Sequence, residues 1–238
     1  MRYFIPTLLV IFIFIGCTSN TGPTMELFGT VKGLKKGTLL LQKFEDSIFT
    51  TVDSIKMDRN PEFHFSREIE SPEIYFLQLQ LNQGSLNHDR ITFFGEAGEL
   101  NIQANLENFG SSAKVSGSKN DSLLKDYNKL KNRYVSQNLD LIERQLKLRG
   151  TGNDSLLNNL RQQKERLLTN KYFATINFAL NHKDYEIAPY LMLSEAPDSN
   201  LKYLDTVYNS LSTKIKNSKY GKELESFIKI KKQDNTPL

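Results

Sequence analysis

From residue 25 onward the pattern of apolar residues changes once, close to residue 117, and this change limits the folds that the chain can adopt. Before it, short stretches alternate between apolar and polar residues and are separated by turn-forming residues. After it, apolar residues recur at steps of three and four. A period of two places residues on one face of a strand, whereas steps of three and four place them on one face of a helix. The sequence therefore predicts a segregated α+β fold, with the strands first and the helices second.

Eight short segments before residue 117 have the composition and alternation of strands. In one of them Leu77, Leu79 and Leu81 fall on the same face. The predicted strands cover 25–31, 38–44, 48–55, 63–65, 74–81, 91–94, 100–104 and 113–115. Short strands at such close spacing are typical of an antiparallel β-sandwich or an open barrel.

Five motifs in this region together resemble a known family. They are FGTVKGL, GTLLL, VDS, FHF and IYFL, at 28–34, 37–41, 52–54, 63–65 and 74–77. In this order they resemble the domain-of-unknown-function family 4369, which precedes thioredoxin-like disulfide reductases in Gram-negative envelope lipoproteins. That family usually has a glycine before its Phe-x-Phe motif, where this sequence has Asn60-Pro61-Glu62.

The resemblance also covers two motifs further along the chain. Ser116-Gly117-Ser118 resembles the family's transition into helices, and 218–222 (SKYGK) resembles the stretch before the reductase domain. A thioredoxin domain needs a Cys-x-x-Cys pair, and this sequence has a single cysteine. The resemblance therefore implies the module without its thioredoxin domain and without reductase activity.

The region after residue 117 predicts a long helical hairpin. Asn120 or Asp121 is expected to cap the first helix, and Gly150 to end it. Asp154 or Ser155 is expected to start the second helix. The first helix has an apolar stripe, and the second has a facing one. The two stripes are Leu123, Tyr127, Leu130, Tyr134, Leu141 and Leu148, and Leu157, Leu160, Leu167, Ala174 and Phe178.

The first helix also has a second apolar stripe, formed by Leu139, Ile142 and Leu146. A second stripe indicates that more than one face of the helix is buried. Shorter helices are predicted over 185–193, 201–211 and 219–230. The expected organisation is a β-sandwich domain at 25–118, a helical domain at 119–230 and a polar tail at 231–238.

The N-terminal segment indicates export. Its apolar run, 4–15, is shorter than the ~20 residues that a membrane-spanning helix needs, and it is typical of a signal peptide. Cys17 is the only cysteine and follows Gly16, which resembles the lipobox of bacterial lipoproteins. The resemblance implies cleavage after 1–16, lipidation of Cys17 and a lipidated tether at 17–24.

A lipidated Cys17 implies a location in the bacterial cell envelope, anchored to a membrane by the N-terminal lipid and facing the periplasm. Thr18 follows the cysteine, where inner-membrane lipoproteins carry Asp, so the outer membrane is favoured. The net charge of +4 is too small to indicate a nucleic-acid partner. No thiol remains for a disulfide or for redox chemistry once Cys17 carries lipid.

The sequence predicts no catalytic, cofactor or metal site. His64, His88 and His182 lack the close spacing of metal ligands. Glu96 and Glu99 flank Gly98; paired carboxylates can hydrolyse glycosides, but solvated acids at a turn are much commoner.

The sequence therefore predicts a non-enzymatic binding or interaction module, whose partner is an envelope protein or a small ligand. Two alternatives stay open. One is an accessory domain that works with a separate thioredoxin-like reductase. The other is a cryptic cell-wall hydrolase that uses Glu96 and Glu99.

Overall fold

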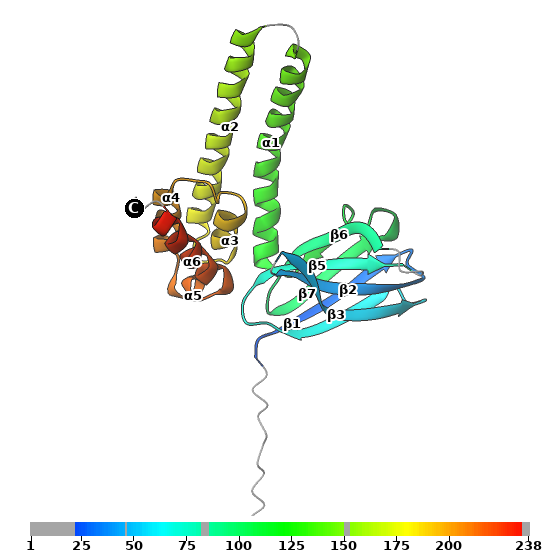
Figure 1. Cartoon of the computed structure of the whole chain (residues 1–238). Helices are drawn as coiled ribbons and strands as arrows, with labels where there is room; N and C mark the ends of the chain where they lie inside the picture. The colour runs from blue at the N-terminus through cyan, green and yellow to red at the C-terminus, as the bar shows by residue number, and fades with distance from the viewer. Residues whose placement is uncertain (1–21, 46, 82–85, 150–152, 235–238) are drawn as a thin grey trace, which may run out of the picture.

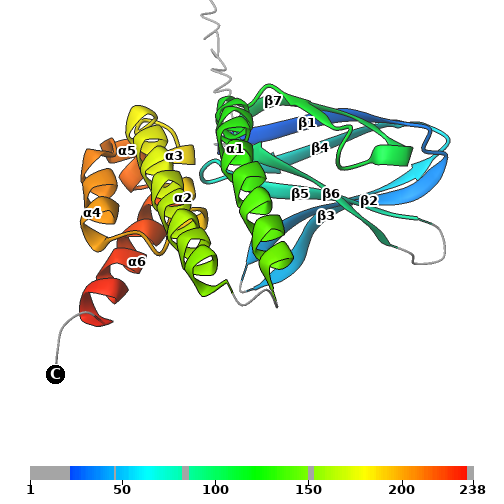
Figure 2. The same ribbon diagram turned by 90° about the horizontal axis from the view of Figure 1, so that it is seen from above.

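The computed structural model describes residues 22–45, 47–81, 86–149 and 153–234. Two sheets form a sandwich, and a long helical hairpin rises from one end of it (Figure 1). From above, α1 lies between the sandwich on one side and the other helices on the other side (Figure 2). This segregated arrangement of strands and helices confirms the predicted fold class.

Each of the eight predicted segments forms a strand. The strands are β1 (Thr24–Lys32), β2 (Lys36–Glu45), β3 (Ile48–Asp58), β4 (Glu62–Glu68), β5 (Glu73–Gln80), β6 (Leu86–Gly95), β7 (Gly98–Asn105) and β8 (Lys114–Ser116). They form two four-stranded sheets, ordered β4-β1-β7-β8 and β3-β2-β5-β6. The paired strands are antiparallel except β1 and β7, which are parallel. Strand β1 therefore lies inside its sheet, between two strands that come much later in the chain.

The core of the sandwich lies between the two sheets. It is built from alternate residues of each strand, as the period of two requires. Its largest buried rings are Tyr75 and Phe93, which stack with their centroids 5.9 Å apart. The other fully buried members include Met25, Leu27, Leu39, Leu41, Phe65, Leu77, Leu79 and Phe109.

The helical half contains the predicted hairpin and a group of shorter helices. The helices are α1 (Lys119–Leu148), α2 (Asp154–Asn181), α3 (Ile187–Ser194), α4 (Leu201–Ser210), α5 (Thr213–Lys216) and α6 (Lys219–Asp234). The one-turn helix α5 was not predicted, because four residues are too few to show a period. Helix α6 continues to Asp234, into the segment that was predicted to be a polar tail.

The predicted cap of α1 was wrong. Ser118 caps the helix, because its hydroxyl accepts a hydrogen bond from the Asp121 amide at 2.9 Å. The Asp121 carboxylate instead accepts from the Phe94 amide at 3.3 Å. The Asn120 side-chain oxygen accepts from the Ile187 amide at 3.0 Å. These two side chains join α1 to the sheet and to α3, and so they are not available as caps.

An apolar cluster joins the sandwich to the helices. Ile74 and Phe94 lie on the outer face of the second sheet and pack against Tyr127 of α1, Leu191 of α3 and Tyr220 of α6. Their neighbours along the strands face the sandwich core, so β5 and β6 are covered on both faces here. The helical half is therefore packed firmly on the second sheet.

The SKYGK motif at 218–222 makes the polar contacts of this junction. The ammonium of Lys219 lies 2.5 Å from a carboxylate oxygen of Glu73. The Tyr220 hydroxyl accepts a hydrogen bond from the Ile74 amide at 2.9 Å. Burial raises the pKa of Tyr220, which keeps this hydroxyl neutral. The motif thus attaches α6 to the second sheet.

Candidate functional site

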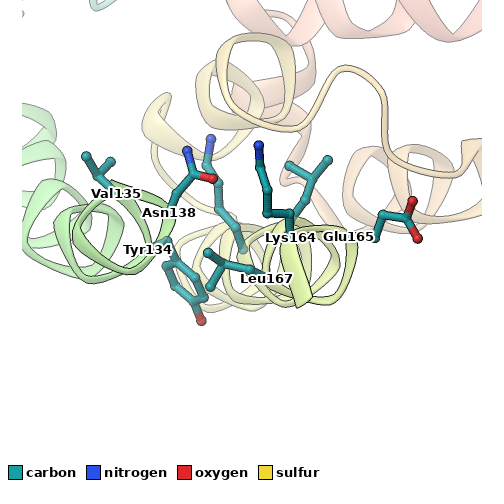
Figure 3. Close-up of a pocket in the computed structure, with 8 residues that line it drawn as sticks. Tyr134, Val135, Asn138, Lys164, Glu165 and Leu167 are labelled. Carbon is teal, nitrogen blue, oxygen red and sulfur yellow. The ribbon is translucent and has the colours of Figure 1, made fainter. Parts of the chain in front are cut away.

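One side of the α1–α2 hairpin has a groove of about 380 Å³. Its lining is Tyr134, Val135 and Asn138 from α1 with Lys164, Glu165, Leu167, Leu168 and Lys171 from α2. Figure 3 shows Val135, Asn138 and Lys164 pointing to the same side of the helix pair, whereas the Tyr134 hydroxyl points to the other side. The leucines and the valine give the groove an apolar interior, and the charged groups lie around it.

An exposed apolar stripe continues from this groove along α1. Val135, Leu139 and Leu146 are 46%, 59% and 54% exposed, and Ile142 is half-buried. These four residues, here called the α1 stripe, follow one another at steps of four, three and four. That spacing is the a and d pattern of a coiled-coil seam. Across the groove Leu168 of α2 is 48% exposed.

Helix α1 therefore has two apolar seams, and only one of them is covered in the described part of the chain. The covered seam faces α2, where Leu141 and Leu160 are buried. In the same interface the Tyr127 and Thr175 hydroxyls lie 2.9 Å apart. The prediction that a second face of α1 is buried was wrong for Leu139 and Leu146.

The opposite side of the hairpin has a different character. A hollow of about 330 Å³ there is lined largely by polar side chains. They include Gln137, Asp140 and Arg144 of α1 and Gln163, Arg166 and Asn170 of α2. The two hollows therefore differ in chemistry, and the one beside the α1 stripe is the more apolar.

The sequence analysis missed two apolar members of the site, Val135 and Leu168. Val135 stands four residues before Leu139, and this step was a signal that the stripe begins earlier. Leu168 carried no such signal, because Leu167 beside it already belonged to the stripe that faces α1.

The Glu195 carboxylate forms ion pairs with both helices of the hairpin at the base of the groove. Glu195 follows α3, and its two oxygens lie 2.9 Å from the Lys131 ammonium and 2.8 Å from the Lys171 ammonium. Burial opposes ionisation of Glu195, but hydrogen bonds from Lys171 and Lys131 outweigh it and lower its pKa. This bridge ties α1 and α2 to α3 where the hairpin leaves the rest of the molecule.

We expect Glu195→Gln to destabilise the protein by roughly 1.5–3 kcal/mol at pH 7, the range for hydrogen bonds to a charged group. The pKa of the Glu195 carboxyl is lower in the folded protein than the value of 4.5 in the unfolded chain, so the ionised carboxylate stabilises the fold above pH 4.5. This stabilisation is lost as the pH falls through the pKa of the folded protein. Urea denaturation at pH 7 and pH 3 measures the difference, which should be full at pH 7 and smaller at pH 3.

Glu143→Gln is the control for this measurement, because Glu143 forms an exposed pair with Lys147 at 2.6 Å. It should leave the free energy of unfolding nearly unchanged at both pH values, because exposed ion pairs contribute little. An equal loss for Glu195→Gln at both pH values would show that the ionised bridge does not stabilise the base of the hairpin.

The histidines are far apart among the elements. His64 of β4 lies 2.6 Å from Glu26 and stacks on Phe28, with ring centroids 4.3 Å apart. His182, after α2, contacts the Phe178 carbonyl oxygen at 2.8 Å, and His88 belongs to β6. Among the residues that the structure describes, no three His, Cys, Asp or Glu side chains are grouped as metal ligands.

The two glutamates considered for hydrolysis have different surroundings. Glu96 accepts hydrogen bonds from the Lys119 amide at 2.5 Å and the Asn120 side-chain amide at 2.8 Å. It therefore holds the start of α1. Glu99 is exposed in β7, beside Glu26 of β1 in the parallel register.

Cys17, the predicted lipidation site, lies outside the described residues, as do the predicted signal peptide and most of the predicted tether. Within the described ranges, no helix has the length and hydrophobicity to cross a membrane.

Comparison with known proteins places the sandwich in a family. Residues 25–124 match the family model described as Domain of unknown function (DUF4369). No curated protein and no solved structure shows a significant match to the chain. The match covers the strands and the first turn of α1, so the groove and the α1 stripe lie beyond it. The N-terminal sandwich of this chain is a DUF4369 domain.

Proposed function

We propose that this chain is a non-enzymatic, lipid-anchored envelope protein that binds a helix of a partner in the groove of its α1–α2 hairpin. The observation that carries this proposal is the exposed α1 stripe. Removing apolar surface from water yields about 25 cal/mol per Å², so a row of exposed aliphatic side chains favours association. Large contiguous apolar patches on soluble proteins mark interaction sites.

The spacing of the stripe supports a helix as the bound element. Steps of four, three and four match the rows of side chains that one helix presents to another. Val135 on α1 and Leu168 on α2 are both exposed at the groove, one on each helix. A third helix lying between these residues would pack against both α1 and α2.

The position of the hairpin supports presentation to a partner. Strand β1 begins at the end of the molecule opposite the hairpin tip (Figure 1). Helix α1 has 30 residues and so is about 45 Å long. A lipid on Cys17 would hold the sandwich at a membrane surface and leave the groove free in the aqueous space.

Site-specific photo-crosslinking in intact cells tests this function. We expect a photoreactive residue at Leu139 to give a protein crosslink, and the same residue at Gln137 to give none. Introducing Leu146→Glu should reduce the Leu139 crosslink at least about tenfold, because a carboxylate would then be buried against the partner without a cation.

Gln163→Glu is the control for charge, because it adds a carboxylate on the polar side of the hairpin. It should leave the crosslink unchanged. Equal crosslinking from Leu139 and Gln137, or none from either, would mean that the α1 stripe is not a binding surface.

A further inference from the structure

The α1 stripe is self-complementary, and we infer that its partner helix is α1 of a second copy of this chain, packed antiparallel. This inference rests on the proposed function, which requires that some helix covers the stripe. It adds the identity of that helix and its direction.

The order of side chains in the stripe supports antiparallel pairing. In an antiparallel coiled coil an a residue of one helix lies opposite a d residue of the other. With the twofold axis between Asp140 and Leu141, Val135 lies opposite Leu146 of the second copy, and Leu139 lies opposite Ile142 of the second copy. Each side chain of the stripe then has an aliphatic neighbour, and one patch serves both copies, as an isologous interface requires.

The residues that flank the stripe support pairing between identical helices. In an antiparallel pair, equivalent flanking rows face each other, so charges in one row would face charges of the same sign. Here one row is Asn138 and Gln145, and the other is Ser136 and Glu143. Asn138 therefore faces Gln145 of the second copy, and Ser136 faces Glu143 of the second copy.

No like charges meet between the flanking rows of the two α1 helices. Glu143, the only charged member of the two rows, is already paired with Lys147 at 2.6 Å in its own helix. Coiled coils that select a different protein usually carry complementary charges in these rows. The two rows of α1 have Glu143 as their single charged residue and so lack such complementary charges, which fits pairing with a second copy of the same helix.

The groove provides room for this pairing. Leu146 of the second copy lies opposite Val135, at the mouth of the 380 Å³ groove, and can insert beside Leu168. The Glu195 bridge contacts α1 at Lys131, which precedes the first residue of the stripe, Val135. At this bridge the hairpin leaves the rest of the molecule. Because the hairpin projects beyond this point (Figure 1), two antiparallel hairpins overlap along the stripe with the two sandwiches at opposite ends.

Sedimentation of the purified full chain in mild detergent tests the stoichiometry, with Cys17→Ser introduced to remove the lipid. We expect a protein mass of two chains. Leu139→Glu with Leu146→Glu should raise the dissociation constant at least about 100-fold and give a single chain. Gln137→Glu with Gln163→Glu adds the same charge on the polar side and should keep two chains.

Disulfide formation tests the direction of the pair. In the Cys17→Ser background, Val135→Cys and Leu146→Cys are prepared separately and then mixed. A disulfide that forms only between the two different variants supports the antiparallel pair. Disulfides within each separate variant would establish a parallel pair and overturn the assigned direction.

Failure of this inference differs from failure of the proposed function. A single-chain mass for the Cys17→Ser protein, with a Leu139 crosslink to a different protein in cells, would overturn the second copy and keep the groove as a binding site. A single-chain mass without any Leu139 crosslink would overturn both.

Discussion

Gly221→Ala should destabilise the protein by about 3 kcal/mol or more, although alanine is the better helix former. Gly221 is the third residue of α6, and a Cβ there would lie 2.0 Å from the Ile215 carbonyl oxygen and 2.8 Å from the Lys216 carbonyl oxygen. Helix propensity favours alanine by up to about 1 kcal/mol. Overpacking against backbone costs about 1–3 kcal/mol and sometimes more, so the clash outweighs the propensity.

Thermal and urea unfolding measure this loss. Gly22→Ala is the matched control, because a Cβ at Gly22 meets no atom within 4 Å. The control should stay within about 0.5 kcal/mol of the unsubstituted protein. A Gly221→Ala protein as stable as the control would mean that α5 and α6 do not approach as closely as described.

Glu73→Gln should have an effect of similar size, about 3 kcal/mol. Glu73 begins β5 with 5% of its surface exposed and contacts the ammonium groups of both Lys43 and Lys219. The amide has nearly the same shape but no charge, so Lys43 would lose its carboxylate partner and Lys219 would keep only Glu45, at 3.6 Å. Removing one member of a buried ion pair costs far more than removing an exposed charge.

Urea unfolding of Glu73→Gln and of Glu99→Gln separates the buried carboxylate from an exposed one. Glu99→Gln, in β7, should change stability by less than about 0.5 kcal/mol. Adding Lys43→Met to Glu73→Gln should recover part of the loss, because the cation that Glu73 had compensated is removed. No recovery in the double variant would contradict the electrostatic cause.

Periodicity was sufficient to predict the layers of this molecule. Alternation in β1 and β2 reflects burial on one face, and the three- and four-residue steps in α1 reflect its contact with α2. The period does not determine which strands pair, because β1 would show the same alternation beside any partner. The parallel pairing of β1 with β7 therefore could not be predicted.

Long-range contacts explain the local errors. Asp121 has the chemistry of a cap, but its carboxylate bonds the Phe94 amide, and Ser118 caps the helix instead. Strand β6 starts at Leu86, earlier than predicted, because backbone pairing such as that of Gln78 with Arg90 needs no apolar pattern. In each case the deciding partner lies on another element.

The candidate site could be predicted only in part. The sequence showed a second stripe on the first helix through Leu139, Ile142 and Leu146. It could not show that this stripe lies open, because exposure depends on where α3 and the sandwich pack. The resemblance to the family gave no help here, since the stripe lies after residue 124.

The central place of β1 in its sheet determines the order in which the chain can fold. Leu27 of β1 lies opposite Phe65 of β4 on one side and opposite Leu100 of β7 on the other. During synthesis β1 emerges before both neighbours and stays incompletely paired until the chain has been made through Asn105. The hairpin of α1 and α2 depends on neighbouring residues, and such local contacts form faster than distant strand pairing. Among the strands, β1 is therefore the one that waits longest for a neighbouring strand.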